Sequence, residues 1–250
     1  MRELVRTTVR TLRGVYVWAV LGVLGMFALL VVLFVPRVEQ RRAIARAAAR
    51  GWMRLSGMPL TVLHEDRLPA GQCVVVANHA SYLDGVVMTA ALPPRFGFVI
   101  KREMSSVPFA GLMLRRLGSQ FVERFNQHRG ASDARRVLRT ASDGHSLAFF
   151  PEGTFSHEPG LLKFHTGAFV TAARAGCPVV PCVIRGTRAA LPSSRILPTP
   201  VPIEVEILPP IARQAQEQER ASLLLRDAAR AAIIASLEPE SRAAATACPS

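Results

Sequence analysis

The chain has 250 residues, half of them apolar, so it can bury an ordinary core without help from disulfide bonds. Its net charge is +13, and of its 31 basic residues only Lys101 and Lys163 are lysines. Such a charge suits nucleic acid, an anionic membrane or an acidic substrate. Only 6% of the residues are aromatic and no nucleic-acid-binding motif is present, so we expect a membrane partner and no nucleic acid.

The four cysteines do not suggest a metal site. They are Cys73, Cys177, Cys182 and Cys248, and they form neither a CxxC pair nor a cluster with histidine. The first three lie in apolar runs, where a reduced cysteine packs as a small hydrophobic side chain. We therefore expect a reducing compartment and no metal.

A hydrophobic segment near the N-terminus predicts a membrane anchor over residues 1–36. Val15–Val35 contains twenty-one residues without a charge, and about 20 such residues form a helix long enough to cross a bilayer core. Tyr16 and Trp18 stand at one end, where aromatic rings prefer the membrane interface. Pro36 follows the segment in place of a signal-peptide cleavage site. Both a spanning helix and a helix within one leaflet fit this pattern.

Arginines on both sides of this segment indicate the orientation. Four precede it and five follow it up to Arg50, so the positive-inside rule leans towards a cytoplasmic C-terminal domain. We expect a bacterial-type inner membrane with that domain on the cytoplasmic side. Residues 37–58 are expected to form a basic helix, either a solvated linker or an interfacial helix that binds acidic headgroups.

From Pro59 onward, short β-rich runs alternate with helical ones. The predicted strands are Leu60–His64, Cys73–Ala77, Phe96–Ile100, Gln120–Glu123, Leu147–Phe150, Val179–Ile184 and Ile203–Ile207. The predicted helices lie near Gly85–Ala91, Val107–Leu117, Arg129–Ser142, Gly167–Ala175 and Gln214–Leu237. Continuous apolar strands that alternate with helices predict an α/β domain, with a mostly parallel sheet flanked by helices, over residues 59–237. Residues 238–250 are expected to be a disordered tail.

The strongest chemical pattern follows the predicted strand Cys73–Ala77. In Asn78-His79-Ala80-Ser81-Tyr82-Leu83-Asp84 the histidine and the aspartate are five residues apart, which places them on different faces of a continuous helix. They converge only if His79 lies in the turn after the strand and Asp84 in the first helical turn, with Ser81 as N-cap. Asp84 would then orient the imidazole and leave its other nitrogen free to accept a proton from a hydroxyl. The alternative is a capping box beside an incidental histidine.

Three further residues carry charge at the ends of other predicted strands. Phe150-Pro151-Glu152-Gly153-Thr154 ends one strand, and the carboxyl ends of parallel strands are where open α/β folds bind ligands. Lys101 and Arg124 follow two more strands, and both residue types bind phosphate. Each feature alone has an ordinary explanation as a turn or a surface cation.

Together, these blocks resemble the glycerolipid acyltransferase superfamily, in particular its lysophosphatidic acid acyltransferase (PlsC-type) branch. The resemblance covers residues 60–211, with all the family's blocks in order. The matching blocks are Asn78–Asp84 (NHx4D), Phe98–Met104 with Gly118–Arg124 (the basic second block), Phe150–Thr154 (FPEGT) and Val179–Ile184 (VVPxxI).

The resemblance implies transfer of a fatty acyl group from acyl-CoA or acyl carrier protein (acyl-ACP) to the free hydroxyl of a lysophospholipid. The leading acceptor is 1-acylglycerol-3-phosphate, which gives phosphatidic acid. His79 would be the general base and Asp84 its orienting partner, with no covalent acyl-enzyme and no cofactor beyond the thioester. The implied substrate-binding residues are Asn78, Lys101, Arg124, Glu152, Gly153 and Thr154.

Two departures from the family pattern concern the acceptor. The family commonly continues FPEGT with Arg-Ser, whereas Phe155-Ser156 follows here, and its later FKxGA reads with His165 in place of lysine. Both changes remove a cation near the expected headgroup site. Arg185 and Arg188 are possible replacements or ordinary loop residues, and a different lyso-lipid acceptor is the first alternative.

Two other functions compete with acyl transfer. Gly144-His145-Ser146-Leu147-Ala148 imitates a serine-esterase elbow, although an elbow serine follows a strand and Ser146 precedes one. A non-enzymatic basic membrane scaffold is the other alternative. It leaves the co-occurrence of His79, Asp84, Arg124 and Glu152 unexplained.

Overall fold

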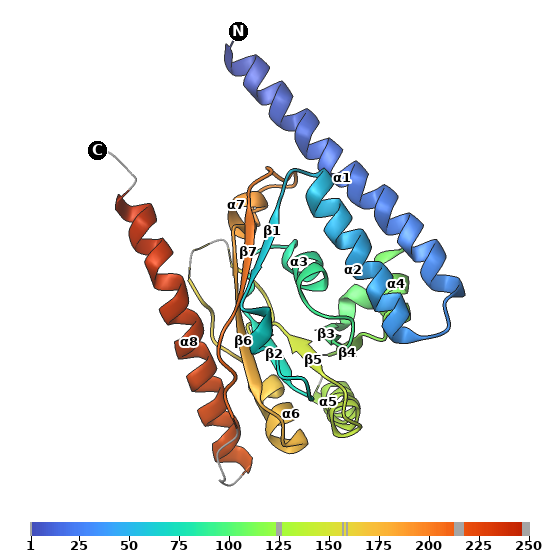
Figure 1. The fold of residues 1–250 in the computed structure, drawn as a ribbon, viewed down its shortest axis with the longest axis vertical. Helices are drawn as coiled ribbons and strands as arrows, with labels where there is room; N and C mark the ends of the chain where they lie inside the picture. The colour runs from blue at the N-terminus through green and yellow to red at the C-terminus, as the bar shows by residue number, and fades with distance from the viewer. Residues whose placement is uncertain (1, 124–126, 157, 159, 213–217, 247–250) are drawn as a thin grey trace.

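The computed structural model describes residues 2–123, 127–156, 158, 160–212 and 218–246 (Figure 1). Within them, seven strands form one sheet in the order β1-β7-β6-β2-β5-β3-β4. The pairing of β6 with β7 is antiparallel and the other pairings between these strands are parallel. The strands are β1 (Leu60–Leu63), β2 (Val74–Ala77), β3 (Gly97–Lys101), β4 (Gln120–Val122), β5 (Leu147–Phe149), β6 (Val179–Arg185) and β7 (Ile203–Ile207). The mostly parallel α/β sheet predicted from the sequence is confirmed, and every predicted strand is present to within one residue at each end.

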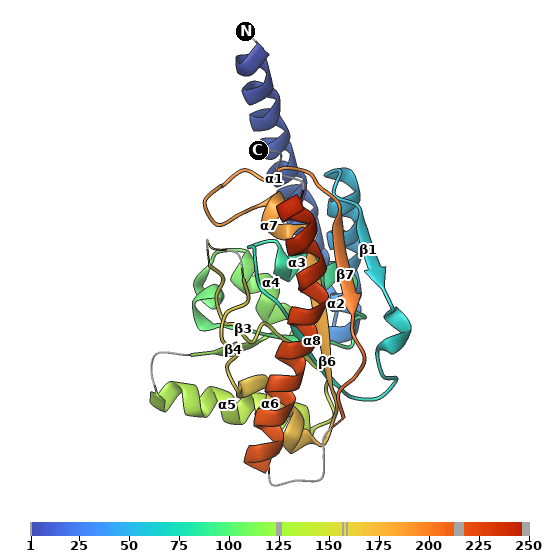
Figure 2. The ribbon, with the colours of Figure 1, turned by 90° about the vertical axis from the view of Figure 1, so that its left-hand side faces the viewer.

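Helices cover both faces of the sheet. They are α1 (Arg2–Phe34), α2 (Val38–Leu55), α3 (Asp84–Ala91), α4 (Ala110–Arg116), α5 (Gln127–Ser142), α6 (Gly167–Ala175), α7 (Thr187–Ala190) and α8 (Gln218–Thr246), with 3-10 turns η1 (Glu65–Arg67) and η2 (Arg102–Ser106). Helices α2 and α3 cover one face, with α1 outside α2, and α6 and α8 cover the other (Figure 2). α8 continues past Leu237, and its backbone is helical through residues 238–246, where the sequence analysis expected a disordered tail.

Strand β2 shows why the apolar runs form a sheet buried on both faces. All four of its residues are buried. Val75 and Ala77 pack in the core beneath α2 and α3, whereas Val74 and Val76 pack in the core beneath α6 and α8. Because successive side chains of a strand point to opposite faces, a continuous apolar run supplies both cores.

Helix α1 is long and apolar enough to cross a membrane, by length and composition, and it is also docked on the domain. Val17 and Val32 are fully buried. The Trp52 indole on α2 donates to the Val17 carbonyl at 2.9 Å, and the Trp18 indole donates to the Ile196 carbonyl at 2.8 Å. The opposite stripe of α1 is exposed and apolar: Tyr16, Val23, Met26, Phe27, Leu30 and Phe34.

The arginines of α2 bind backbone carbonyls at the ends of neighbouring helices. Arg41 donates to the carbonyls of Val35 and Pro36, just after α1. Arg46 and Arg50 both donate to the Ala90 carbonyl at the end of α3. The last carbonyls of a helix have no partner within it and attract cations. The basic linker helix therefore has a structural role besides the two roles considered from the sequence.

Candidate active site

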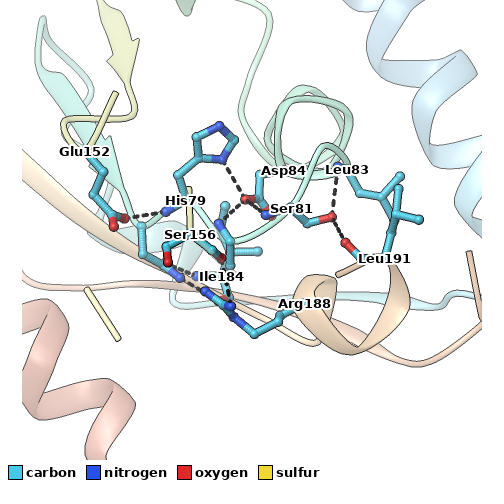
Figure 3. Close-up of polar contacts among 11 residues, drawn as sticks. His79, Ser81, Leu83, Asp84, Glu152, Ser156, Ile184, Arg188 and Leu191 are labelled. Atoms are coloured by element: carbon cyan, nitrogen blue, oxygen red, sulfur yellow. Dashed lines mark hydrogen bonds and ion pairs between the residues drawn. The ribbon is translucent and has the colours of Figure 1, made fainter. Parts of the chain in front are cut away.

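The turn after β2 brings His79 and Asp84 together (Figure 3). β2 ends at Ala77 and α3 begins at Asp84, so His79 lies in the turn and Asp84 in the first helical turn, as the spacing predicts. The distance between His79 Nδ1 and Asp84 Oδ2 is 2.8 Å. The five-residue spacing therefore produces a direct contact.

Asp84 is fully buried and anchored by the same turn. Its Oδ2 accepts hydrogen bonds from the backbone N–H groups of Ala80, at 2.6 Å, and Ser81, at 2.8 Å. This oxygen therefore acts as the acceptor for the whole turn. The N-cap of α3 is Leu83 and not Ser81 as expected. Ser81 still closes the turn before the helix, because its hydroxyl accepts the Leu83 N–H at 3.2 Å and donates to the Leu191 carbonyl at 2.8 Å.

This contact determines which imidazole nitrogen is free to react. Because Asp84 Oδ2 already accepts two N–H groups, it is the acceptor in this contact as well, so Nδ1 of His79 carries the proton and donates a hydrogen bond to it. Nε2 then keeps its lone pair. The His79 side chain is 19% exposed, so a substrate hydroxyl can reach Nε2. Chemically, the pair is suited to general-base catalysis.

Two phenylalanines flank the imidazole, and neither was among the predicted site residues. The Phe150 ring stacks on His79 with centroids 4.5 Å apart, and Phe155 meets it edge-on at 4.7 Å. Phe155 also contacts Tyr82 edge-on. Phe155 stands where the family pattern has arginine, and that departure was the available signal. An apolar ring therefore lies against the histidine where a cation was expected.

Glu152 holds the backbone of this turn. It is 3% exposed; its Oε1 accepts the His79 N–H at 2.6 Å and its Oε2 accepts the Leu162 N–H at 2.8 Å. Burial raises the pKa of this carboxyl, although the two N–H groups partly oppose that effect. The geometry makes Glu152 a positioning residue for His79, and its contact with substrate remains a prediction.

Asn78 has a similar role, because its side chain binds the backbone of the neighbouring strand β6. Its side-chain amide donates to the Ile184 carbonyl at 3.0 Å and its oxygen accepts the Ile184 N–H at 2.7 Å. These two bonds join the end of β2 to β6. The side chain is buried and occupied by backbone groups, so Asn78 orients the turn, and its contact with substrate also remains a prediction.

Three of the remaining predicted binding residues, Lys101, Gly153 and Thr154, lie along the same edge of the sheet. Gly153 has a φ of +75° and its N–H donates to the Phe150 carbonyl, and Thr154 is exposed beside it. Lys101 ends β3, and its Nζ lies 3.0 Å from a carboxylate oxygen of Glu103. Arg124 lies outside the described residues.

The two arginines considered as replacement cations differ in their surroundings. Arg185 donates to carboxylate oxygens of Glu204 and Glu206, each at 2.8 Å, and is largely buried. Arg188 donates to the Ser156 carbonyl at 3.1 Å, in the loop beside His79 (Figure 3). Arg188 therefore stands nearer the candidate headgroup site, whereas Arg185 connects β6 to β7.

Ser146 lies at the opposite end of the sheet from His79. It precedes β5, is 5% exposed, and its hydroxyl accepts the Cys73 N–H at the start of β2. His79 follows the end of β2, so the rise of the strand separates the two by roughly 15 Å or more. The esterase arrangement therefore has no histidine from this turn near its serine.

Among the described residues, no group of three or more histidine, cysteine, aspartate or glutamate side chains could hold a metal ion.

Known proteins resemble this chain in sequence and in fold. A family model described as Acyltransferase matches residues 59–185. A 1-acyl-sn-glycerol-3-phosphate acyltransferase of Chlamydomonas reinhardtii is 30% identical over 92% of this chain and 70% of its own length. One of Haemophilus influenzae is 32% identical over 49% of this chain and 52% of its own length. The chain thus spans about half of the length of some of these relatives.

A solved structure shares the fold. It is the 1-acyl-sn-glycerophosphate acyltransferase PlsC of Thermotoga maritima, with a TM-score of 0.70 and 21% identity. The superposition covers 93% of this chain and 97% of that one. At this identity the likeness concerns the fold alone.

Proposed function

This chain belongs to the acyltransferase family, and on that premise we propose that it is a membrane-bound O-acyltransferase acting on a lysophospholipid. The proposed acceptor is 1-acylglycerol-3-phosphate, which yields phosphatidic acid, because the relatives named above carry that activity in their names. The proposed donor is acyl-CoA or acyl-ACP. The thioester is a co-substrate, and the proposal includes no further cofactor.

The observation that carries the proposal is the 2.8 Å contact between His79 and Asp84. As the acceptor oxygen attacks the thioester carbonyl, Nε2 of His79 takes the hydroxyl proton. The carbon–sulfur bond then breaks, and the thiolate leaves with a proton returned from the imidazolium. A positioned base of this kind contributes roughly 10²–10⁴-fold, and the orientation of the two substrates contributes further.

The residues around this pair divide into two proposed groups. Glu152 and Asn78 hold the turn in shape through the backbone bonds described above. Lys101, Arg124, Gly153 and Thr154 are proposed to bind the acceptor, with a guanidinium or ammonium meeting its phosphate. Arg188 joins this group as a cation beside the Ser156 loop.

The proposed location is a bacterial-type inner membrane, with the domain on the cytoplasmic side where acyl-CoA and acyl-ACP occur. The exposed apolar stripe of α1 supports membrane attachment. An uncovered stripe of this length on a soluble monomer would be unusual.

A second candidate acceptor rests on one observation. Phe155 occupies the position of the family's arginine and packs on His79, which favours a lyso-lipid whose headgroup carries less negative charge. The chemistry at His79 would be the same.

The test is thioester-dependent acylation of a panel of lysolipids by the purified protein, with His79→Ala as the inactive control. Preferred use of 1-acylglycerol-3-phosphate supports the main proposal, and preferred use of a neutral or zwitterionic lysolipid supports the second. Acceptor-independent hydrolysis that survives His79→Ala and disappears in Ser146→Ala would replace both with an esterase. No acyl transfer to any acceptor from either thioester would contradict the proposal.

A further inference from the structure

The segment that follows β3 exposes more apolar surface than folding requires. Within residues 104–112, called here the apolar loop, Phe109 is 64% exposed. Three neighbours are also exposed large hydrophobic residues: Met104 at 39%, Val107 at 40% and Leu112 at 37%. Single exposed apolar residues are common on soluble proteins, but a cluster on one short segment marks a contact surface.

The backbone of the apolar loop holds Phe109 outward. Phe109 has a φ of +58° and a ψ of −54°, and the Ala110 N–H donates to the Pro108 carbonyl at 2.6 Å, which defines a γ-turn. This turn is rare and strained for a bulky residue. Such strain persists only where the surroundings enforce it, and it concentrates at functional positions.

Contacts on both sides of the turn enforce this conformation. A Cβ on Gly111 would lie 2.4 Å from the Ser105 carbonyl oxygen, so the chain closes tightly only with glycine at this position. Arg115 donates to the same carbonyl at 2.6 Å. The conformation of the apolar loop is therefore fixed by contacts with its own base.

Helix α4 attaches the apolar loop to α1. Arg116 donates to the carbonyls of Val32, at 3.2 Å, and Leu33, at 2.5 Å, near the end of α1. The neighbouring α1 side chains Leu30 and Phe34 are 52% and 87% exposed. Exposed apolar side chains of α1 therefore lie within two residues of its contact with α4.

The position of the loop relative to His79 follows from the sheet. β2 and β3 are both parallel to β5, so the segments after them emerge at the same edge. His79 follows β2 and the apolar loop follows β3. Arg115 at the base of the loop is exposed and suits anionic headgroups. The negative charge of Glu103, just before the loop, is paired with Lys101.

We propose that residues 104–112 insert into the lipid surface as a second membrane-binding element beside α1, with Phe109 at the tip. The occupant is a bilayer that contains anionic lipid. It is favoured over a protein partner because α4 fixes the loop to the end of α1, the helix whose exposed apolar stripe supports membrane attachment. Inserted there, the loop seats the sheet edge that carries His79 on the membrane. The proposal builds on the membrane attachment proposed above and is independent of the reaction.

The test measures insertion directly and needs no turnover. An environment-sensitive fluorophore is attached to Phe109→Cys in the full chain, with Cys248 replaced by serine; Cys73, Cys177 and Cys182 are buried. Met104→Cys repeats the measurement away from the strained turn. Phe34→Cys, on α1, is the positive control, and Leu224→Cys, exposed on α8 across the sheet, is the negative control.

The labelled proteins are mixed with phosphatidylglycerol–phosphatidylcholine vesicles that carry nitroxide on their acyl chains. We expect blue-shifted emission and quenching at positions 109, 104 and 34, and neither change at 224. Quenching at 34 together with an unchanged signal at 109 and 104 would overturn the proposal. Absence of quenching at all four positions would overturn the membrane attachment itself, whereas loss of acyl transfer would affect neither conclusion.

A second measurement uses binding strength. Phe109→Ser combined with Leu112→Ser should weaken partitioning into the same vesicles by about tenfold, because the apolar area that enters lipid is lost. The matched control is Leu223→Ser combined with Leu224→Ser, which should partition normally. Equal partitioning of both double variants would also overturn the proposal.

Discussion

His79 has one nitrogen engaged by Asp84, and the side chain is still 19% exposed. If Nε2 is the base, His79→Ala should lower kcat by on the order of 10²-fold or more. The fold and membrane association should be unchanged, because the side chain is not part of either apolar core. Turnover of the purified variant, with circular dichroism as a check on folding, measures this. The control is His145→Ala, at an exposed position, and near-normal turnover of the His79 variant would remove the proposed base.

The same measurement on Asp84→Asn separates orientation from capping. The amide would favour the wrong imidazole tautomer and would lose the charge that accepts the Ala80 and Ser81 N–H groups. We expect a loss nearly as large as that of His79→Ala. If the defect is mild, Asp84 has only a structural role in the turn.

The burial of Glu152 should make the stability of the protein depend on pH. Burial raises the pKa of this carboxyl above its usual 4.5, so the folded protein holds the proton more tightly than the unfolded chain. The resulting stabilisation is fully present below the unfolded pKa of about 4.5 and is lost as the pH rises through the higher folded pKa. Urea unfolding of wild type and Glu152→Gln between pH 4 and 7 measures it. The free energy of unfolding of wild type should fall relative to the variant across that window, and parallel curves would contradict the prediction.

The sequence predicted the reactive residues better than those that hold them. His79 and Asp84 are close in sequence, and their spacing already implies a turn followed by a helix. The partners of Asn78 and Glu152 are backbone groups of Ile184 and Leu162, on segments that only folding brings to this turn. Composition and spacing carry no information about such contacts, so both residues were expected to bind substrate.

Among the elements, the strands were the easiest to predict. β2, β5 and β6 are short apolar runs between turn residues, which only a strand buried on both faces explains. The helix expected over Val107–Leu117 instead begins at Ala110. Pro108, Phe109 and Ala110 form a γ-turn there, next to the tight contact at Gly111. An apolar helical period does not reveal a turn of this kind.

The attachment of α8 to the sheet depends on Arg185. Its guanidinium bonds Glu204, Glu206 and the Ser236 carbonyl of α8. Arg185→Met would leave two carboxylates unpaired, and breaking a buried pair costs about 3–5 kcal/mol. The loss here should be nearer 1–3 kcal/mol, because partial exposure of the glutamates weakens the pair. Chemical unfolding, with hydrogen exchange to locate the change in α8, measures it.

Two further experiments test whether Arg185 attaches α8 to the sheet. Arg226→Met removes an exposed pair with Asp227 on the same helix and should change stability little. Burial alone would raise the pKa of Glu206, but the Ser236 hydroxyl and Arg185 outweigh it and lower that pKa. The stabilisation from Glu206 is therefore present above about pH 4.5 and lost on acidification. Arg185→Met should remove this loss of stability at low pH. If the variant loses as much stability on acidification as wild type does, the acid dependence comes from other groups.

At the scale of the whole molecule, the packing of α1 limits how the protein meets a membrane. α1 packs along α2 (Figure 1), and α2 carries Arg41, Arg42, Arg46 and Arg50. A spanning α1 would draw these arginines into hydrocarbon, where each is costly. A helix that lies within one leaflet keeps its buried stripe on α2 and its exposed stripe in lipid. The sequence left both arrangements open, because the buried stripe becomes visible only with α2 in place.

We therefore predict that both ends of the α1–α2 pair lie on the cytoplasmic side. Thr7, in the arginine-flanked first turns of α1, and Leu55, at the end of α2, are both exposed. In sealed inside-out inner-membrane vesicles, a membrane-impermeant maleimide should label Thr7→Cys and Leu55→Cys equally, and in intact spheroplasts it should label neither. The matched control is Leu224→Cys on the domain, which should behave like Leu55→Cys. Labelling of Thr7→Cys in spheroplasts but not in inside-out vesicles would mean that α1 crosses the bilayer after all. Labelling of all three positions in spheroplasts would place the domain on the outer side, away from a cytoplasmic thioester donor.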